Sequence, residues 1–384
     1  MKSFAYALIL TLVITACSDH EEKPIKEDAN NALLVFMPYT GDSRNLYENF
    51  KLNLHDMERA IKEKGGLGDN TVLVFISSSS SKSDLFRIRY ERGQCIHDTL
   101  RTYLQNNYTT ADGIAQLMSE MKGLAKAKSY GMVIGCHGEG WIPKSSRKNI
   151  STRYFGGTSA AYRIDVSDFA QGLADAGLHL RYLLFDDCYM SGIEVAYELR
   201  GITDYLIAST SEIMAYGMPY HKILPALLDT PDYEKICTEF LNFYNAYTVN
   251  GKSYPYGAIG VTDCRVANEM ATTMKQVNAL CSLDPDRLQD IQDLDGGHWN
   301  PTVYFDFGDY LQKLCEDHPD MLRSLQDLLQ RLVPYKACTE NIYSEASGQP
   351  VPVNSFSGIT ISDPSVNSYV LSTKQQTAWW LATH

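Results

Sequence analysis

Two residue types that perform nucleophilic chemistry each follow a short apolar run in this chain. His137 ends the segment YGMVIGCH, and Cys188, 51 residues further on, ends the segment YLLFDDC. Apolar runs of this length are typical of strands that are buried on both faces of a parallel sheet. Neither histidine nor cysteine helps a strand to fold, so their placement indicates a cysteine nucleophile with a histidine as its proton-transfer partner.

The residues beside this pair suit the same chemistry. The carboxyl ends of parallel strands meet at one edge of a sheet, so the fold would bring His137 and Cys188 together. Gly138 allows a sharp turn after the histidine and presents an unobstructed N–H that can bind an oxyanion. A helix predicted over Met190–Leu199 would begin next to Cys188, where the free amides of the first turn favour a thiolate.

The chain around these residues alternates between strand and helix patterns. Continuous apolar runs predict strands over 33–39 and 71–77, and a helix with one apolar stripe lies between them and ends at Gly65 and Gly66. This succession predicts an α/β fold, in which a mostly parallel sheet is flanked by helices on both faces. Further elements are predicted at 85–90 (a hairpin strand), 111–127 and 165–176 (helices), and 205–209, 257–261 and 356–362 (strands).

Length, composition and charge limit the class of protein. The chain has 384 residues, of which 44% are hydrophobic and 21% charged, as is ordinary for a globular protein. We assign residues 32–220 to the catalytic core and residues 221–384 to a C-terminal part packed on it, with helices and further strands. A net charge of −12 and the lack of a dense Lys/Arg stripe argue against nucleic acid as a partner. No internal apolar run is long enough to span a bilayer.

The N-terminus has the pattern of an export sequence. The apolar stretch 4–14 follows a lysine and has the length of a secretory signal region, and it leads into ITAC, which looks like a bacterial lipobox. We therefore expect residues 1–16 to be a lipoprotein signal peptide, Cys17 to carry the lipid, and the polar residues 17–31 to form a flexible tether. The protein would be membrane-anchored in the bacterial cell envelope, outside the cytoplasm. The alternative is an N-terminal core helix.

Together, the two segments around the histidine and the cysteine resemble a known family. HGEG and DDCYMSGIEVAYEL are similar to the clostripain family of caspase-like cysteine peptidases, in which His-Gly follows one strand and Asp-x-Cys-x-Met follows the next. The resemblance extends from about residue 33 to at least residue 220. The matching positions here are His137, Gly138, Asp186, Cys188 and Met190, followed by Glu194 and Glu198.

The resemblance implies a caspase-like fold and an endopeptidase that cleaves proteins or peptides after a basic residue. Cys188 would attack the scissile carbonyl as a thiolate and form a thioester, and His137 would return the proton to the leaving amine. The N–H groups of Gly138 and Cys188 would stabilise the oxyanion. This chemistry requires no cofactor, and we predict no metal ligands. Calcium dependence occurs in the family, and the sequence leaves it open. We expect a monomer.

Three residues are candidates for the substrate pocket. Strand side chains alternate, so Asp186 is expected on the same face as Cys188, where the family pattern places the acidic residue that receives Arg or Lys. A carboxylate beside a thiol opposes thiolate formation, so we expect a bound cationic substrate to help activate Cys188. Where the family often has a second acidic residue, this chain has Tyr216, which weakens the case for basic specificity. Glu212 is the candidate replacement.

A basic loop over 144–158 separates the two catalytic candidates. The family matures by cleaving itself in such a loop, leaving two associated chains, and Arg147 and Lys148 are the candidate cleavage positions here. A solvated charged loop is the alternative for this composition.

Two other function classes remain open from the sequence. The first is a catalytically silent caspase-like lipoprotein that binds proteins. Tyr216, at the position where the family often has an acidic residue, is the feature that supports this alternative. The second is another acyl-transfer enzyme on the same dyad, such as a transpeptidase or an amidase.

Some residues near the proposed dyad are expected to be structural. We expect Cys136 in the core, Asp187 bonded to backbone amides, and Glu194 and Glu198 in hydrogen bonds.

Overall fold

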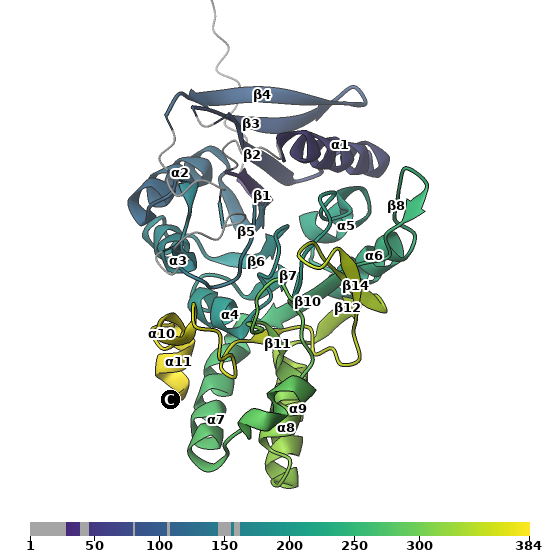
Figure 1. Ribbon diagram of the computed structural model, residues 1–384. Coiled ribbons are helices and arrows are strands. Elements are labelled where there is room, and N and C mark those ends of the chain that lie inside the picture. The colour runs from purple at the N-terminus through teal and green to yellow at the C-terminus, as the bar shows by residue number, and fades with distance from the viewer. Residues whose placement is uncertain (1–27, 39–45, 80, 106–107, 145–154, 157–161) are drawn as a thin grey trace, which may run out of the picture.

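The computed structural model describes residues 28–38, 46–79, 81–105, 108–144, 155–156 and 162–384 (Figure 1). The predicted signal peptide, the candidate lipidation site Cys17 and the self-cleavage candidates Arg147 and Lys148 lie outside these ranges. None of the helices in the described ranges is both long and apolar enough to cross a membrane.

A nine-stranded sheet forms the centre of the molecule (Figure 1). Its five middle strands, β7, β6, β5, β1 and β2, run parallel, and two antiparallel strands close each edge. The predicted parallel core is therefore confirmed. In sheet order, the strands are β12 (Tyr335–Cys338), β10 (Ala258–Asp263), β7 (Tyr205–Ala208), β6 (Leu180–Phe185), β5 (Ala127–Ile134), β1 (Ala29–Met37), β2 (Asn70–Ser79), β3 (Lys82–Glu91) and β4 (Gln94–Tyr103).

Helices cover both faces of this sheet, as predicted. One face packs against α1, α5 and α6, and the other against α2, α3, α4 and α7. Along β1, Leu34 joins the core on one face and Val35 the core on the other, which explains why the strand is continuously apolar. The helices are α1 (Tyr47–Lys64), α2 (Ala111–Leu124), α3 (Val166–Asp175), α4 (Ile193–Leu199), α5 (Tyr220–Leu228), α6 (Tyr233–Asn245) and α7 (Ala267–Leu280).

The rest of the C-terminal part is built from short elements. Helices α8 and α9 pack on each other, and α11 packs on α4 and α7 (Figure 1). Because β10 and β12 belong to the central sheet, residues beyond 220 complete the core as well as packing on it. The remaining helices are α8 (Phe307–Leu314), α9 (Pro319–Leu332), α10 (Leu371–Lys374) and α11 (Ala378–Thr383), with 3-10 turns at Cys264–Val266 and Pro285–Asp290. The short strands are β8 (Thr248–Val249), β9 (Lys252–Ser253), β11 (Phe305–Asp306), β13 (Asn341–Ser344), β14 (Gln349–Pro352) and β15 (Thr360–Ile361).

Three boundaries differ from the prediction. Strand β1 begins at Ala29, so the last residues of the predicted tether 17–31 pair with β2 and β5 instead. The strand predicted over 356–362 shortens to β15, which pairs only with β11 among the described strands. Helix α4 begins at Ile193 and not at Met190, because the intervening backbone is extended: Ser191 N donates to Ser209 O over 2.8 Å.

Candidate active site

The two candidate catalytic residues occupy equivalent positions on neighbouring strands. Strands β5 and β6 are parallel and pair Ile134 with Phe185, the last residue of each. His137 and Cys188 each lie three residues beyond that pair. The ladder continues one step further, since Asp186 N donates to Ile134 O over 2.8 Å. The two loops therefore leave the same edge of the sheet side by side, as predicted.

Gly138 shows how closely these loops approach. A Cβ atom placed on Gly138 would lie 2.2 Å from the carbonyl oxygen of Cys188 and 2.8 Å from its nitrogen. Both neighbours are backbone atoms that cannot rotate away, so any side chain at position 138 would push the loops apart. The glycine is required here by close packing, and its backbone lies directly against that of Cys188.

Cys188 lines a small cavity of about 90 Å³. His137 and Cys188 both line it and are 8% and 6% exposed, so little bulk water surrounds them. The N–H of Ile213, from the segment after β7, donates to Cys188 Sγ over 3.4 Å. The remaining walls come from Phe50 and Asn53 of α1 and from the segment that follows β7.

Asp186 lines the same cavity, in agreement with the prediction. Its carboxylate accepts hydrogen bonds from Met218 N and from Tyr220 Oη, both over 2.9 Å. Burial raises the pKa of Asp186 to about 7, and these two hydrogen bonds only partly oppose that effect. Each carboxylate oxygen can accept more than one hydrogen bond, so the group can still bind a cation.

Asp187 points away from the cavity, as strand alternation would place it, even though strand β6 ends two residues earlier at Phe185. Its Oδ1 atom accepts the N–H of Cys136 over 2.6 Å, which confirms that it bonds backbone amides. Burial raises the pKa of Asp187 to about 8. Burial also raises the pKa of the Cys136 thiol well above its usual value, with the charge of Asp187 adding to the effect. Cys136 is buried, as expected, and it also lines the cavity.

The expected placement of Glu212 and Tyr216 is corrected by the structure. Neither is among the described residues that line the cavity. Tyr216 packs against α1 and α6, where its hydroxyl bonds Asp56 and its ring stacks on Phe243 with centroids 4.8 Å apart. Glu212 points behind Cys188, where its Oε2 accepts the N–H of Glu345 over 2.9 Å. The sequence could not reveal these directions, because both residues lie in an irregular segment without strand alternation.

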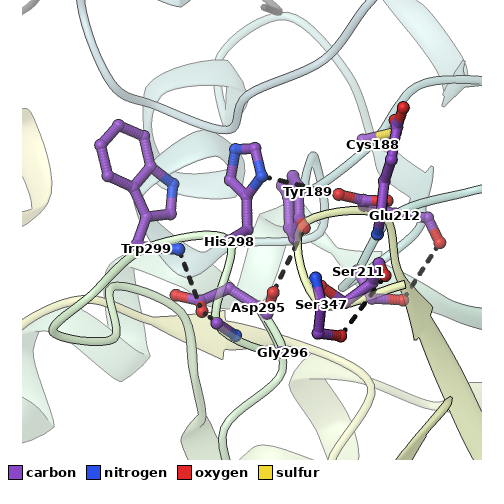
Figure 2. A network of polar contacts seen from close by, with 12 residues as sticks. Cys188, Tyr189, Ser211, Glu212, Asp295, Gly296, His298, Trp299 and Ser347 are labelled. Carbon is purple, nitrogen blue, oxygen red and sulfur yellow. Dashed lines mark hydrogen bonds and ion pairs between the residues drawn. The ribbon is translucent and has the colours of Figure 1, made fainter. Parts of the chain in front are cut away.

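A buried histidine that sequence reasoning missed lies beside Glu212. His298 Nε2 lies 2.9 Å from Glu139 Oε1, and its Nδ1 lies 3.6 Å from Glu212 Oε1. The imidazole also stacks on Tyr189, with centroids 5.3 Å apart (Figure 2). Glu139 is part of the HGEG segment that carried the resemblance, which was the one available indication. Nothing in the sequence linked it to a histidine 159 residues away.

Structural hydrogen bonding was predicted for both glutamates that follow the cysteine, and the structure shows it for Glu194. Glu194 is buried, and its Oε1 accepts the N–H of Ser362 over 2.7 Å. Burial raises its pKa to about 8. Glu194 and Glu198 line a separate cavity of about 380 Å³ between α3, α4 and α11, away from Cys188. Within the part of the chain that the structure describes, no group of three or more His, Cys, Asp and Glu side chains is arranged to hold a metal ion.

Comparisons with known proteins agree with this arrangement. The family model for the clostripain family matches residues 38–368. A secreted C11 cysteine protease from Bacteroides thetaiotaomicron, "iotapain", is 43% identical, with a TM-score of 0.86 over 93% of this chain and 100% of that one. A clostripain from the same species, solved with the peptide inhibitor BTN-VLTK-AOMK, is 49% identical, with a TM-score of 0.57 over 60% of this chain and 99% of that one.

An inactive zymogen C11 protease from Parabacteroides distasonis shares the fold at 24% identity, with a TM-score of 0.78 over 94% of this chain and 99% of that one. A search of curated proteins found no significant match. The family model spans most of the chain, and the first of these structures matches nearly all of it. The chain therefore belongs to the clostripain family and is a cysteine-type peptidase.

Proposed function

We propose that Cys188 and His137 form the catalytic dyad of this peptidase, and that it is an endopeptidase acting through a thioester. The observation that carries this proposal is the contact of the two loops: Gly138 packs on the backbone of Cys188, and both dyad residues line one cavity. The two residues and the cavity come from one chain, so the proposed active unit is a monomer.

In this mechanism, Cys188 Sγ attacks the scissile carbonyl carbon as a thiolate. The N–H groups of Gly138 and Cys188 stabilise the negative charge that develops on the carbonyl oxygen. His137 carries the proton from the thiol and delivers it to the leaving amine as the C–N bond breaks. Water then hydrolyses the thioester and regenerates the thiol. Cysteine and histidine supply every group that reacts, so the proposed reaction requires no cofactor.

We assign substrate recognition to Asp186. It is the one carboxylate among the described residues that line the cavity with Cys188, which favours a basic residue on the amino side of the cleaved bond. The inhibitor solved with the 49% identical clostripain contains the peptide VLTK, which ends in lysine. A substrate cation would hold Asp186 as a carboxylate and neutralise it, which removes the opposition to thiolate formation at Cys188.

The remaining proposals concern cellular location and maturation. The 43% identical relative is described as secreted, which agrees with a site outside the cytoplasm. The sequence ITAC at Cys17 supports a lipid anchor in the bacterial cell envelope. The basic composition of the 144–158 loop supports self-cleavage at Arg147 or Lys148, which would leave two associated chains. Mass spectrometry of the purified protein would detect both the lipid and the cleavage.

The dyad is tested with the chain lacking only its predicted signal peptide, as the wild type and as Cys188→Ala, His137→Ala and Cys136→Ala. Each protein is incubated with a peptide library varied at the residue before the cleaved bond. We expect cleavage after Arg or Lys by the wild type and by Cys136→Ala only. Cleavage after other residues would retain the dyad but contradict the role of Asp186.

Two outcomes would change the assignment of function. An intact wild-type chain that cleaves nothing and has an unreactive thiol would favour a catalytically silent binding protein. Efficient transfer of the acyl group to added amines, instead of to water, would favour a transpeptidase, because hydrolysis and transpeptidation share the thioester and differ only in the acceptor.

A further inference from the structure

His298 belongs to a loop of the C-terminal part, far in sequence from both proposed dyad residues, yet its ring lies against Tyr189, the residue that follows Cys188 (Figure 2). Its side chain is only 13% exposed. The loop around it is fixed by Asp295, whose carboxylate accepts the N–H groups of Val303 over 2.7 Å and of Tyr304 over 3.2 Å. The position of the imidazole is therefore set by the fold.

Three contacts connect this imidazole to three active-site segments. Glu139, at 2.9 Å from Nε2, lies two residues after His137. Tyr189, whose ring stacks on the imidazole at an interplanar angle of 29°, directly follows Cys188. Glu212, at 3.6 Å from Nδ1, directly precedes Ile213, whose N–H donates to Cys188 Sγ. One side chain thus contacts residues that lie within two positions of His137, Cys188 and Ile213.

These partners have few alternative positions. Tyr189 is almost fully buried between His298 and Tyr304, whose ring stacks on it with centroids 5.2 Å apart. Its backbone has φ 61°, a left-handed conformation that a tyrosine rarely adopts, so the turn after Cys188 is strained. The hydroxyl of Tyr304 also donates to the carbonyl oxygen of Glu139 over 2.5 Å. Packing by His298 helps to hold this strained turn.

We propose that His298 is a positioning residue for catalysis: as an imidazolium bound between Glu139 and Glu212, it holds the His137 loop, the Cys188 turn and the Ile213 amide in register. This inference rests on the proposed Cys188 and His137 dyad. His298 does not itself face the cavity in which the substrate binds, so its effect is exerted through the residues that it contacts.

The charges around His298 favour its protonated form. Burial alone lowers the pKa of His298, but the hydrogen bond and charge of Glu139, followed by the charges of Glu212 and Asp295, outweigh it and raise the pKa above its usual value. The titratable group stacked on the ring, Tyr189, remains neutral because burial raises its pKa well above its usual value. A neutral imidazole carries no charge to attract the two carboxylates, so deprotonation would weaken its ion pairs with Glu139 and Glu212.

The raised pKa of His298 should make the activity depend on pH. A histidine whose pKa is raised in the folded protein contributes its full stabilisation below its unfolded value of about 6.5, and loses it as pH rises through the folded value. We therefore expect the turnover number, kcat, to fall on the alkaline side as His298 loses its proton. The Michaelis constant should change little, because Asp186 is held by Met218 and Tyr220.

The test compares wild type, His298→Gln, Glu212→Gln and His179→Gln. His179 is an exposed histidine paired with Asp204 at the far end of β6, so its variant serves as a matched control. For each protein, kcat and KM are measured from pH 6 to pH 10, together with the melting temperature and the rate at which iodoacetamide alkylates Cys188.

We expect His298→Gln to lower kcat at least tenfold near neutral pH without the alkaline fall seen in the wild type. Glu212→Gln removes one negative charge that faces His298, so the alkaline fall should move to lower pH. This shift keeps the inference testable if His298→Gln does not fold, and a role in stability alone would not produce it. His179→Gln should match the wild type in every measurement.

Two results would overturn the inference. One is a folded His298→Gln that keeps the wild-type kcat and pH profile while only its melting temperature falls. The other is a Glu212→Gln whose alkaline limb does not move. Failure of the dyad itself would look different, because wild type and Cys188→Ala would then cleave equally and there would be no wild-type profile to change.

Discussion

The N–H of Ile213 donates a hydrogen bond to Cys188 Sγ over 3.4 Å. The sequence had assigned residues of the segment after β7 to the substrate pocket, and this contact brings the backbone of that segment against the thiol itself. A backbone N–H directed at sulfur favours the thiolate over the thiol, because a hydrogen bond to the charged form lowers its energy. The helix that was expected to do this begins five residues later, at Ile193.

Gly138→Ala should disable the peptidase. The new Cβ would meet the backbone of Cys188 at 2.2 Å, so the loops that carry His137 and Cys188 must separate and the proposed oxyanion-binding amides must move. Loss of one such donor typically costs about 10² to 10³ in kcat. The matched control is Gly123→Ala in α2, where a Cβ meets nothing within 4 Å. An alanine at 138 with full activity would contradict this account of the close approach.

Alkylation should distinguish Cys188 from Cys136, although both reach the same cavity. The pKa of the Cys136 thiol is raised by burial and by Asp187, so it stays protonated and unreactive near neutral pH. Brief treatment with iodoacetamide at pH 7.5, followed by peptide mass analysis, should find the label on Cys188 in the wild type. Cys136→Ala should label at the wild-type rate. A label on Cys136 would indicate that the thiolate has been assigned to the wrong residue.

Preference for basic substrates should depend on pH through Asp186. Burial raises the pKa of Asp186 to about 7, so the empty site loses its negative charge as pH falls below that value. The ratio of kcat/KM for an arginine peptide to that for its citrulline analogue should fall by up to about tenfold per pH unit below 7. Taking the ratio removes any pH effect on the chemical step that both peptides share. Asp186→Asn should make the ratio small and independent of pH.

Tyr216→Phe should leave specificity unchanged. The hydroxyl bonds Asp56 away from the cavity, and the ring keeps its stacking on Phe243 without it. Loss of one hydrogen bond to a carboxylate should lower the free energy of unfolding by about 1 kcal/mol. The kcat/KM for arginine peptides should stay within about twofold of the wild type, whereas Asp186→Asn lowers it. A tenfold loss at unchanged stability would return Tyr216 to the substrate pocket.

The sequence by itself determined the elements that position the site. Apolar runs such as Leu33–Met37 had to be buried on both faces, because no polar residue interrupts them, and this implied parallel strands covered by helices. Parallel strands present their carboxyl ends at one edge, so the order of strands along the chain was enough to place His137, Asp186 and Cys188 together. The apolar stripe predicted on α1 is confirmed, because its buried residues recur at helical spacing. The predicted helix end is also confirmed, since Gly65 adopts the left-handed conformation that ends a helix.

Only the tertiary structure decided which groups surround the thiol. The Ile213 amide, the packing of Tyr216 against α1 and α6 and the His298 ion pairs all involve irregular segments, where side-chain direction follows no period in the sequence. Each also depends on contacts between residues that are far apart in the chain, such as His298 and Glu139. A repeating backbone fixes which face a side chain occupies, whereas a loop takes its conformation from whatever packs against it. The sheet edge that carries His137, Asp186 and Cys188 could therefore be predicted, and the loop contacts around the thiol could not.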